Sequence, residues 1–148
     1  MLTSPSPDVP AAYRVLIVDD DEDMRILLNR ALCKTPLPLE VEVAVDGQEA
    51  LDFVSRQWLP HLVVTDIMMP RIDGFELCAL LRANPLTATI PIVMLTALED
   101  EEHKAHSLRV GANDYLTKSS GYRDLTGRLL QLLEQRYGRS QGNRADSQ

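Results

Sequence analysis

Short β-branched runs alternate with longer segments of helical periodicity along most of the chain. Residues 15–18 are continuously apolar, as in a strand that is buried on both faces. Residues 41–45 alternate between valine and other residues, which is typical of a strand with one partly solvated face and predicts a sheet edge. Further strands are predicted at residues 62–64, 90–95 and 114–117.

Apolar residues at helical spacing predict one helix after each strand. The fourth helix is expected to end at Gly111, which suits a C-cap. Because parallel strands need crossover connections, five strands that alternate with five helices predict an α/β fold, with a parallel sheet covered on both faces. The apolar helical residues are, in chain order, Met24, Leu27, Leu28, Leu32, Ala50, Leu51, Phe53, Val54, Phe75, Leu77, Cys78, Leu81, Ala105, Leu108, Tyr122, Leu125, Leu129, Leu132 and Leu133.

The length of 148 residues suits one folded domain, because a chain of about 150 residues can bury about 70% of its unfolded surface. We predict a disordered leader at residues 1–12, a folded domain at residues 13–137 and a polar tail or linker at residues 138–148. The leader has no signal-peptide pattern, and no apolar run is long enough to cross a bilayer. We therefore expect a cytoplasmic protein without membrane contact.

The net charge of −7 is concentrated in two short segments. Residues 19–23 are five consecutive acids, and residues 99–102 are four more. The rest of the chain has 13 acidic and 15 basic residues and no basic stripe, so direct binding of nucleic acid is not expected. Residues 21–23 and 99–102 are predicted to begin the first and the fourth helix, where negative charge is favoured.

Polar side chains stand at the predicted carboxyl ends of four strands, where open parallel sheets bind ligands. Asp19 and Asp20 follow the first strand, and the third, fourth and fifth strands are followed or closed by Asp66, Thr96 and Lys118. Neighbouring carboxylates repel one another, and a hard cation such as Mg²⁺ would relieve the repulsion. The metal would attract a phosphoryl group, for which Lys118 offers a charge and Thr96 a hydroxyl. A carboxylate in that setting can act as a nucleophile in phosphoryl transfer.

These residues belong to an ordered set of motifs: Ile17-Val18-Asp19-Asp20, Asp66-Ile67-Met68-Met69-Pro70, Asp73-Gly74, Thr96-Ala97, Gly111-Ala112 and Tyr115-Leu116-Thr117-Lys118. The set resembles the receiver domains of two-component response regulators, such as the chemotaxis regulators. The resemblance covers residues 14–137 and implies a single (βα)5 doubly wound domain with the flavodoxin-like strand order 2-1-3-4-5. It also implies a signalling module rather than an enzyme, which accepts a phosphoryl group from a histidine kinase or a histidine phosphotransfer protein.

The resemblance implies that Asp66 is the phosphoacceptor and that Asp19 and Asp20 hold Mg²⁺. Asp66 itself and the backbone carbonyl of Met68 would complete the protein ligands. The side chains of Met68 and Leu98 would flank the path of the hydrolytic water. Because neither side chain can orient water by a hydrogen bond, we predict slow dephosphorylation.

The resemblance also implies that Thr96 and Lys118 bind the phosphoryl group, and that Tyr115 is a switch residue that turns inward once Thr96 moves. The surface of the fourth helix, fifth strand and fifth helix would then change shape, so that a downstream effector senses phosphorylation. The family usually has proline after the lysine, in a cis peptide that aims it. Here Ser119 follows Lys118. A cis peptide before a residue other than proline costs about 3 kcal/mol, so we expect a trans peptide and a more mobile loop.

Three other functions fit parts of the pattern. A Mg²⁺-dependent phosphatase that works through an aspartyl phosphate would need a second acid two residues after Asp66, where this chain has Met68. A flavin-binding domain would need glycines and donors after the first strand, where the acids would repel a phosphate. The main alternative is a degenerate receiver that acts as a phosphorylation-independent docking module. We expect a monomer or a weak homodimer.

Five side chains outside these motifs carry simpler expectations. Cys33 and Cys78 are flanked by apolar helical residues and are predicted to be buried free thiols. His103 and His106 lie three residues apart on a predicted helix without a third metal ligand nearby, so we expect solvated side chains. Trp58 follows the second helix and is expected to pack against it.

Overall fold

The computed structural model describes residues 10–138, and these residues form one five-stranded parallel sheet. The strand order is β2-β1-β3-β4-β5, which confirms the predicted topology. Residues 1–9 and 139–148, which hold most of the predicted leader and tail, lie outside the described part of the chain. The strands are β1 (Tyr13–Val18), β2 (Leu39–Ala44), β3 (Leu62–Thr65), β4 (Ile92–Thr96) and β5 (Asp114–Thr117).

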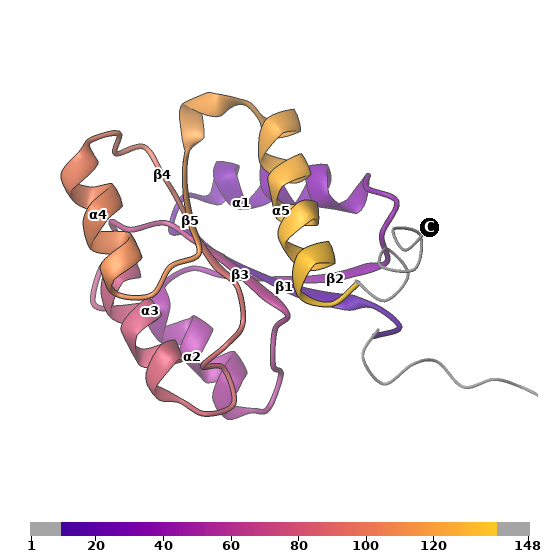
Figure 1. Ribbon diagram of the computed structural model, residues 1–148, viewed down its shortest axis with the longest axis horizontal. Coiled ribbons are helices and arrows are strands. Elements are labelled where there is room, and N and C mark those ends of the chain that lie inside the picture. The colour runs from indigo at the N-terminus through magenta and orange to yellow at the C-terminus, as the bar shows by residue number, and fades with distance from the viewer. Residues whose placement is uncertain (1–9, 139–148) are drawn as a thin grey trace, which may run out of the picture.

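Helices cover both faces of the sheet, so the molecule has three layers (Figure 1). Two helices lie on one face and three on the other, and a short 3₁₀ turn, η1, lies between β5 and the last helix. No helix within residues 10–138 is both long enough and apolar enough to span a membrane. The helices of the first face are α1 (Glu22–Cys33) and α5 (Tyr122–Arg136), those of the second are α2 (Gly47–Ser55), α3 (Gly74–Ala83) and α4 (Glu101–Arg109), and η1 is Lys118–Ser120.

The apolar run of β1 is divided between two cores, because successive side chains of a strand point to opposite faces of the sheet. Leu16 and Val18 pack in the core under α2 and α3, whereas Val15 and Ile17 pack in the core under α1 and α5. All four side chains are buried. The structure thus confirms a central strand that is covered on both faces.

β2 is an edge strand, as its alternating pattern predicts, but it ends one residue earlier than expected. Val45 is 43% exposed, and its backbone N–H donates to the Glu49 carboxylate at 2.7 Å. Asp46 next to it caps α2 and accepts from the Glu49 N–H at 2.9 Å, so this segment belongs to the start of the helix.

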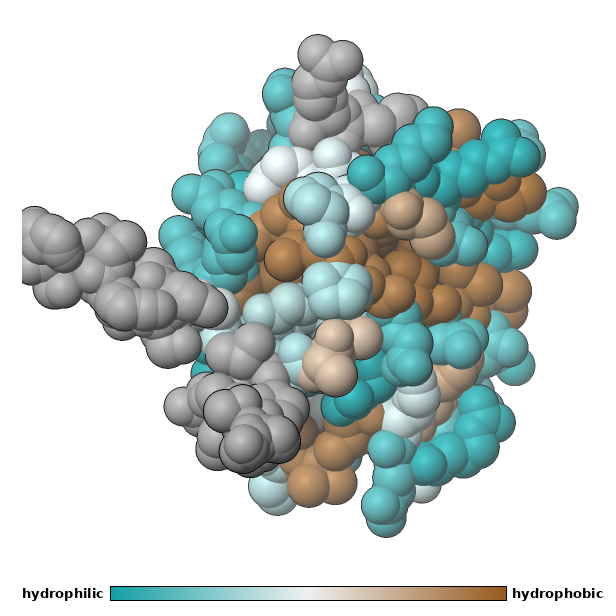
Figure 2. Space-filling model, turned by 90° about the vertical axis from the view of Figure 1, so that its right-hand side faces the viewer, coloured by the Kyte–Doolittle hydropathy of each residue, from teal (hydrophilic) through white to brown (hydrophobic). Residues whose placement is uncertain are grey.

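Figure 2 shows the face of the molecule that lies on the right of Figure 1. Apolar residues lie across the middle of this face, between hydrophilic ones.

Four of the helices begin at an aspartate whose carboxylate accepts a backbone N–H of the first turn. Such caps satisfy donors that have no partner inside the helix and place negative charge at its positive end. The prediction that residues 21–23 begin a helix is therefore confirmed. In the second acidic segment the helix cap is Asp100, so Glu99 lies outside α4 and has a different contact, described below. The capping residues are Asp21, Asp46, Asp73 and Asp100.

Two of the simpler expectations were wrong, and one strand begins later than predicted. Cys78 is buried, but Cys33 is exposed, because it follows the buried Leu32 by one helical position and is turned about 100° away from the core. His106 is stacked on Phe75 with ring centroids 3.9 Å apart, so it is a packed side chain rather than a solvated one. β4 begins two residues later than predicted, because the preceding residues form a turn.

Candidate functional site

Three carboxylates meet where β1 and β3 end. Oxygen atoms of Asp19, Asp20 and Asp66 all lie within 4.8 Å of one another. The parallel register explains the meeting, because β1 and β3 are neighbouring strands and Val18 pairs with Thr65 immediately before the acids. Asp19 and Asp66 are buried and Asp20 is exposed, which leaves one side of the cluster open to solvent.

Lys118 is the positive charge of this cluster. Its Nζ lies 2.9 Å from Asp19 Oδ2 and 2.9 Å from Asp66 Oδ2. Burial alone would lower the pKa of Lys118, but the two carboxylates outweigh that effect and raise it. Lys118 therefore stays charged, and it reaches both acids although the peptide bond to Ser119 is trans.

Asp19 is the most buried acid of the three, with 2% of its surface exposed. Its Oδ1 accepts from the Asp21 backbone N–H at 3.0 Å, and its backbone carbonyl accepts from Arg25 Nη1 at 2.7 Å. Burial raises the pKa of the Asp19 carboxyl, although the contacts with Asp21 and Lys118 act in the opposite direction. The side chain is thus fixed in place while its negative charge is only partly compensated.

The backbone of Asp66 and Ile67 packs closely against the start of α3. Its Oδ1 accepts from the Ile67 N–H at 2.6 Å, and 8% of its surface is exposed. The Gly74 N–H donates to the Ile67 carbonyl at 2.8 Å, and a Cβ atom at Gly74 would lie 2.3 Å from the Asp66 backbone oxygen. The glycine of the predicted Asp73-Gly74 motif is therefore required for this close approach, which the sequence pattern alone did not explain.

The loop between β3 and α3 carries Met68, which is 62% exposed. Arg71 in the same loop has a left-handed backbone with φ of 67° and forms an ion pair with Asp46, the cap of α2. Hydrogen bonds from the Glu49 N–H and from Arg71 lower the pKa of Asp46. The loop is therefore anchored to a neighbouring helix, a contact that the sequence reasoning missed.

Thr96 and Tyr115 are joined through Leu98. The Thr96 Oγ1 accepts from the Leu98 N–H at 3.3 Å, and the Tyr115 hydroxyl donates to the Leu98 carbonyl. Both Thr96 and Tyr115 are buried, so the tyrosine ring already points inward in this structure. Burial, followed by the charges of nearby acids such as Asp100, raises the pKa of Tyr115, which keeps its hydroxyl a donor. The predicted inward turn on movement of Thr96 stays a prediction.

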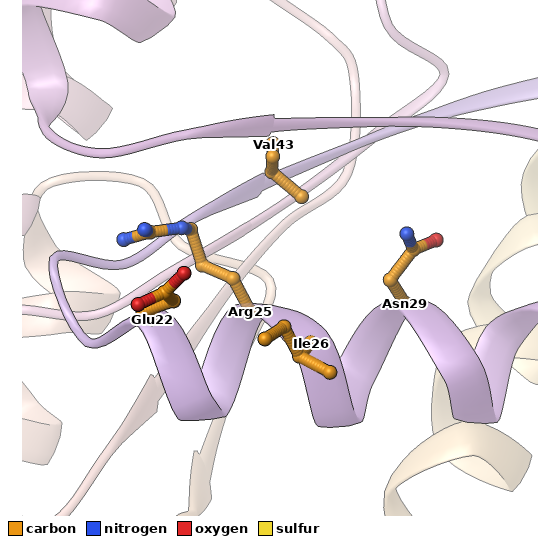
Figure 3. A pocket seen from close by; sticks show the side chains of 5 residues that line it. All are labelled: Glu22, Arg25, Ile26, Asn29 and Val43. Carbon is orange, nitrogen blue, oxygen red and sulfur yellow. The ribbon is translucent and has the colours of Figure 1, made fainter.

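A shallow groove lies between α1 and β2 (Figure 3), and one of the residues that line it also contacts Asp19 of the carboxylate cluster. The Arg25 side chain connects the two, because it lines the groove and also donates to the Asp19 carbonyl. Sequence reasoning gave Arg25 no role, since a hydrogen bond to a backbone carbonyl leaves no mark on the apolar pattern. The residues that line the groove are Glu22, Arg25, Ile26, Asn29 and Val43.

The carboxylate cluster has the donor set of a hard divalent cation. All side-chain donors are oxygens, which favours Mg²⁺ or a similar ion over softer metals. Lys118 supplies one positive charge against three carboxylates, so the cluster keeps a net charge of about −2. The sequence-predicted residues Asp19, Asp20, Asp66 and Lys118 are thus brought together, with Thr96 buried at the end of β4.

Comparison with known proteins relates most of the chain to one family. The family model described as the response regulator receiver domain matches residues 15–130. The response regulator MprA of Mycolicibacterium vanbaalenii is 41% identical over 120 residues, which cover 81% of this chain and 50% of that protein. The chain thus spans about half the length of such curated relatives.

Solved structures agree with the sequence comparison. The signal receiver domain of a signal transduction histidine kinase from Syntrophus aciditrophicus has a TM-score of 0.75 and 34% identity, covering 83% of this chain and 91% of that one. The Mn²⁺-bound form of response regulator Rcp1 has a TM-score of 0.69 and 29% identity, covering 82% of this chain and 91% of that one. The fold is therefore shared with receiver domains and response regulators of known structure.

Proposed function

Because this chain belongs to the response regulator receiver domain family of two-component signalling, we propose that Asp66 accepts a phosphoryl group and so controls a binding surface. The observation that carries the proposal is the meeting of three carboxylates with Lys118, whose Nζ lies 2.9 Å from both Asp19 and Asp66. The donor would be a phosphohistidine of a kinase or of a phosphotransfer protein. An Asp66 oxygen forms the new bond to phosphorus as the bond from phosphorus to the imidazole nitrogen breaks.

Asp19, Asp20, Asp66 and the backbone carbonyl of Met68 would hold Mg²⁺. A bound Mg²⁺ would supply charge neutralisation for the incoming phosphoryl oxygens. The Mn²⁺-bound form of response regulator Rcp1 supports divalent-cation binding by this chain. Lys118 would neutralise a further oxygen, because its side chain already lies at hydrogen-bond distance from Asp66.

Thr96 would donate its hydroxyl to the attached phosphoryl group. Its Oγ1 accepts the Leu98 N–H, so a shift of Thr96 toward the phosphoryl group would pull on the loop that holds the Tyr115 hydroxyl. The surface of α4, β5 and α5 would change with it, and a downstream effector that binds the two states differently by about 1–3 kcal/mol would respond. Tyr115 is the link because it lies under α4 and contacts the loop directly.

Signalling rather than turnover fits the chemistry of the site. A phosphatase needs a group that activates water, and the side chain two residues after Asp66 is the thioether of Met68. The partners we propose are a histidine kinase or a histidine phosphotransfer protein and a downstream effector, in the cytoplasm, without direct contact of residues 10–138 with nucleic acid or membrane. The protein would act as a monomer or a weak homodimer.

Acetyl phosphate with Mg²⁺ tests the proposal directly. We expect intact-mass spectrometry to show a gain of one phosphoryl group that EDTA and Asp66→Ala both abolish. Asp52→Asn serves as a control, because it removes an exposed acid that lies in α2 and is not a member of the carboxylate cluster. No mass gain, together with no effect of beryllofluoride on Tyr115 fluorescence, would contradict phosphorylation and favour the phosphorylation-independent docking module.

A further inference from the structure

Ser119 joins two loops of the site by a hydrogen bond that the proposed function does not use. Its Oγ donates to Glu99 Oε2 at 2.9 Å and lies 3.2 Å from the Thr117 Oγ1. Glu99 lies in the loop between β4 and α4, whereas Ser119 lies in η1, between β5 and α5. The contact therefore crosses between loops that follow neighbouring strands of the sheet.

Each of the two loops is joined to one residue of the proposed phosphoryl site, Lys118 or Thr96. Lys118 directly precedes Ser119 and forms the ion pairs with the carboxylates. Thr96, the last residue of β4, directly precedes the other loop, which contains the Leu98 carbonyl that accepts from Tyr115. A hydrogen bond between Ser119 and Glu99 therefore ties the segment that carries the lysine to the segment that carries the threonine.

The segment that carries Lys118 needs such support. η1 is a single turn of three residues, and it is followed by Gly121, whose φ is 94°. A 3₁₀ turn of this length has little stability of its own, and a lysine side chain loses much conformational freedom when it is fixed. A hydrogen bond from a hydroxyl to a carboxylate is charge-assisted and is roughly twice as strong as one between neutral groups.

We propose, resting on the function proposed above, that Ser119 and Glu99 are a positioning pair for Lys118. Their hydrogen bond sets where the lysine stands relative to Asp66, and it makes the two loops move together when a phosphoryl group engages Thr96 and Lys118. Neither residue touches the reacting atoms, so both act through the lysine and the loop backbone. The exposed position of both side chains makes the tie a local one, which need not affect global stability.

Hydrogen exchange on the unphosphorylated full chain tests the pair without reference to phosphorylation. In Ser119→Ala and in Glu99→Ala we expect peptides that cover residues 97–100 and 118–121 to exchange about threefold to tenfold faster, because loss of either partner releases both loops. Ser119→Thr keeps the hydroxyl and should restore the parent rate. Glu102→Ala is the matched control, since it removes an exposed acid from the same acidic segment, residues 99–102, and leaves the hydrogen bond intact. Unchanged exchange in both variants overturns the proposal.

The phosphorylation rate of Asp66 with acetyl phosphate and Mg²⁺ gives the second measurement. Ser119→Ala and Glu99→Ala should each slow incorporation about threefold to tenfold with little change in Tm, and the double variant should be no slower than either single variant. Independent, multiplicative effects in the double variant would overturn the pairing. If the parent chain incorporates no phosphoryl group, the proposed function fails, while the exchange measurement still decides whether the pair holds η1.

Discussion

Asp20 is the exposed member of a cluster in which three carboxylates face one lysine. It lies near two buried acids, and its charge is therefore unfavourable until a cation binds. We predict that Asp20→Asn stabilises the metal-free protein by about 0.5–1 kcal/mol, because it removes like-charge repulsion at a solvent-screened position. Mg²⁺ should stabilise the variant less than the parent, since a ligand is lost.

Urea unfolding in EDTA and at millimolar Mg²⁺ measures both effects. Asp23→Asn is the matched control, because it removes the same charge from the first turn of α1, where an acid is favourable. The control should be neutral or slightly destabilising in EDTA and should respond to Mg²⁺ like the parent. Equal stability of Asp20→Asn and the parent in EDTA, with an equal response to Mg²⁺, would exclude Asp20 from the cation site.

Met68 supports a second prediction at the residue scale, because it lies two residues after Asp66 and is 62% exposed. A thioether cannot orient a water molecule by a strong hydrogen bond, whereas an amide can. We expect Met68→Asn to shorten the half-life of phosphorylated Asp66, on the order of threefold to tenfold. Met68→Leu, which keeps an apolar side chain, should leave the half-life unchanged. A half-life in Met68→Asn as long as in the parent contradicts the prediction.

At the scale of elements, the start of α3 determines where Asp66 stands. A methyl group at Gly74 would lie 2.3 Å from the Asp66 backbone oxygen and 2.8 Å from the Ile67 Cα, both of which are backbone atoms that cannot rotate away. We predict that Gly74→Ala lowers the free energy of unfolding by about 2 kcal/mol or more and also slows phosphorylation of Asp66. Both effects follow from moving α3 away from the end of β3.

Gly127 provides the contrasting substitution in α5. A Cβ atom at this position would meet nothing within 4 Å, and the residue lies inside a helix. Gly127→Ala should therefore raise the free energy of unfolding by about 0.5–1 kcal/mol, because alanine loses less backbone entropy. Chemical denaturation of both variants, together with the acetyl phosphate assay, separates a general glycine effect from the close contact at α3. Equal stabilities of the two variants would refute the steric argument.

The periodicity of apolar residues predicted the elements and their order. A half-buried strand buries every second residue, and a helix that packs on a sheet buries every third or fourth. The apolar run of β1, the edge position of β2 and the glycine after α4 were all readable in this way, and the strand ends placed Asp19, Asp66 and Lys118 together. The pattern did not predict every boundary of these elements. Val45 continues the alternating pattern of β2, but its N–H donates to Glu49 in the first turn of α2.

Contacts between polar groups of distant loops were not predictable in the same way. The ion pair of Arg71 with Asp46 and the hydrogen bond of Ser119 with Glu99 join residues about twenty to twenty-five positions apart, and no period relates them. Glu99 belongs to a run of acids, so its charge suggested a helix start and gave no indication of its hydrogen bond with Ser119. Such contacts depend on how neighbouring loops fold over one another, which the apolar pattern does not describe.

At the scale of the whole molecule, the end of the sheet opposite to the carboxylates is closed by an aromatic cluster. Tyr13 begins β1, His61 precedes β3 and Tyr137 follows α5. The His61 ring lies 5.7 Å from the Tyr13 ring and 4.9 Å from the Tyr137 ring, and the Tyr137 hydroxyl donates to the His61 carbonyl at 2.9 Å. β1 separates this cluster from Asp19 by roughly 20 Å. The aromatic cluster and the carboxylate cluster thus lie at different ends of the same strands.

This cluster predicts how the stability of the fold depends on pH. The Arg14 N–H donates to His61 Nδ1 at 2.8 Å, so the ring is held neutral, and burial, with a smaller contribution from the Arg14 charge, lowers the pKa of His61 from 6.5 to about 4. Below pH 6.5 the unfolded chain binds a proton that the folded protein does not bind until about pH 4. Stability present above pH 6.5 is therefore lost as the pH falls through this window, by about 1–2 kcal/mol after allowance for solvent screening.

His61→Asn isolates this contribution, because asparagine does not titrate in the window. The variant should be less stable than the parent at pH 7, where it lacks the aromatic contacts, but its unfolding free energy should fall less between pH 6.5 and pH 4. Asp19 has a raised pKa and favours the folded state as it takes up a proton, so it acts in the opposite direction in both proteins and cancels in the comparison. Parallel pH profiles from urea unfolding would show that His61 titrates alike in the folded and unfolded chain, and that the cluster contributes packing alone.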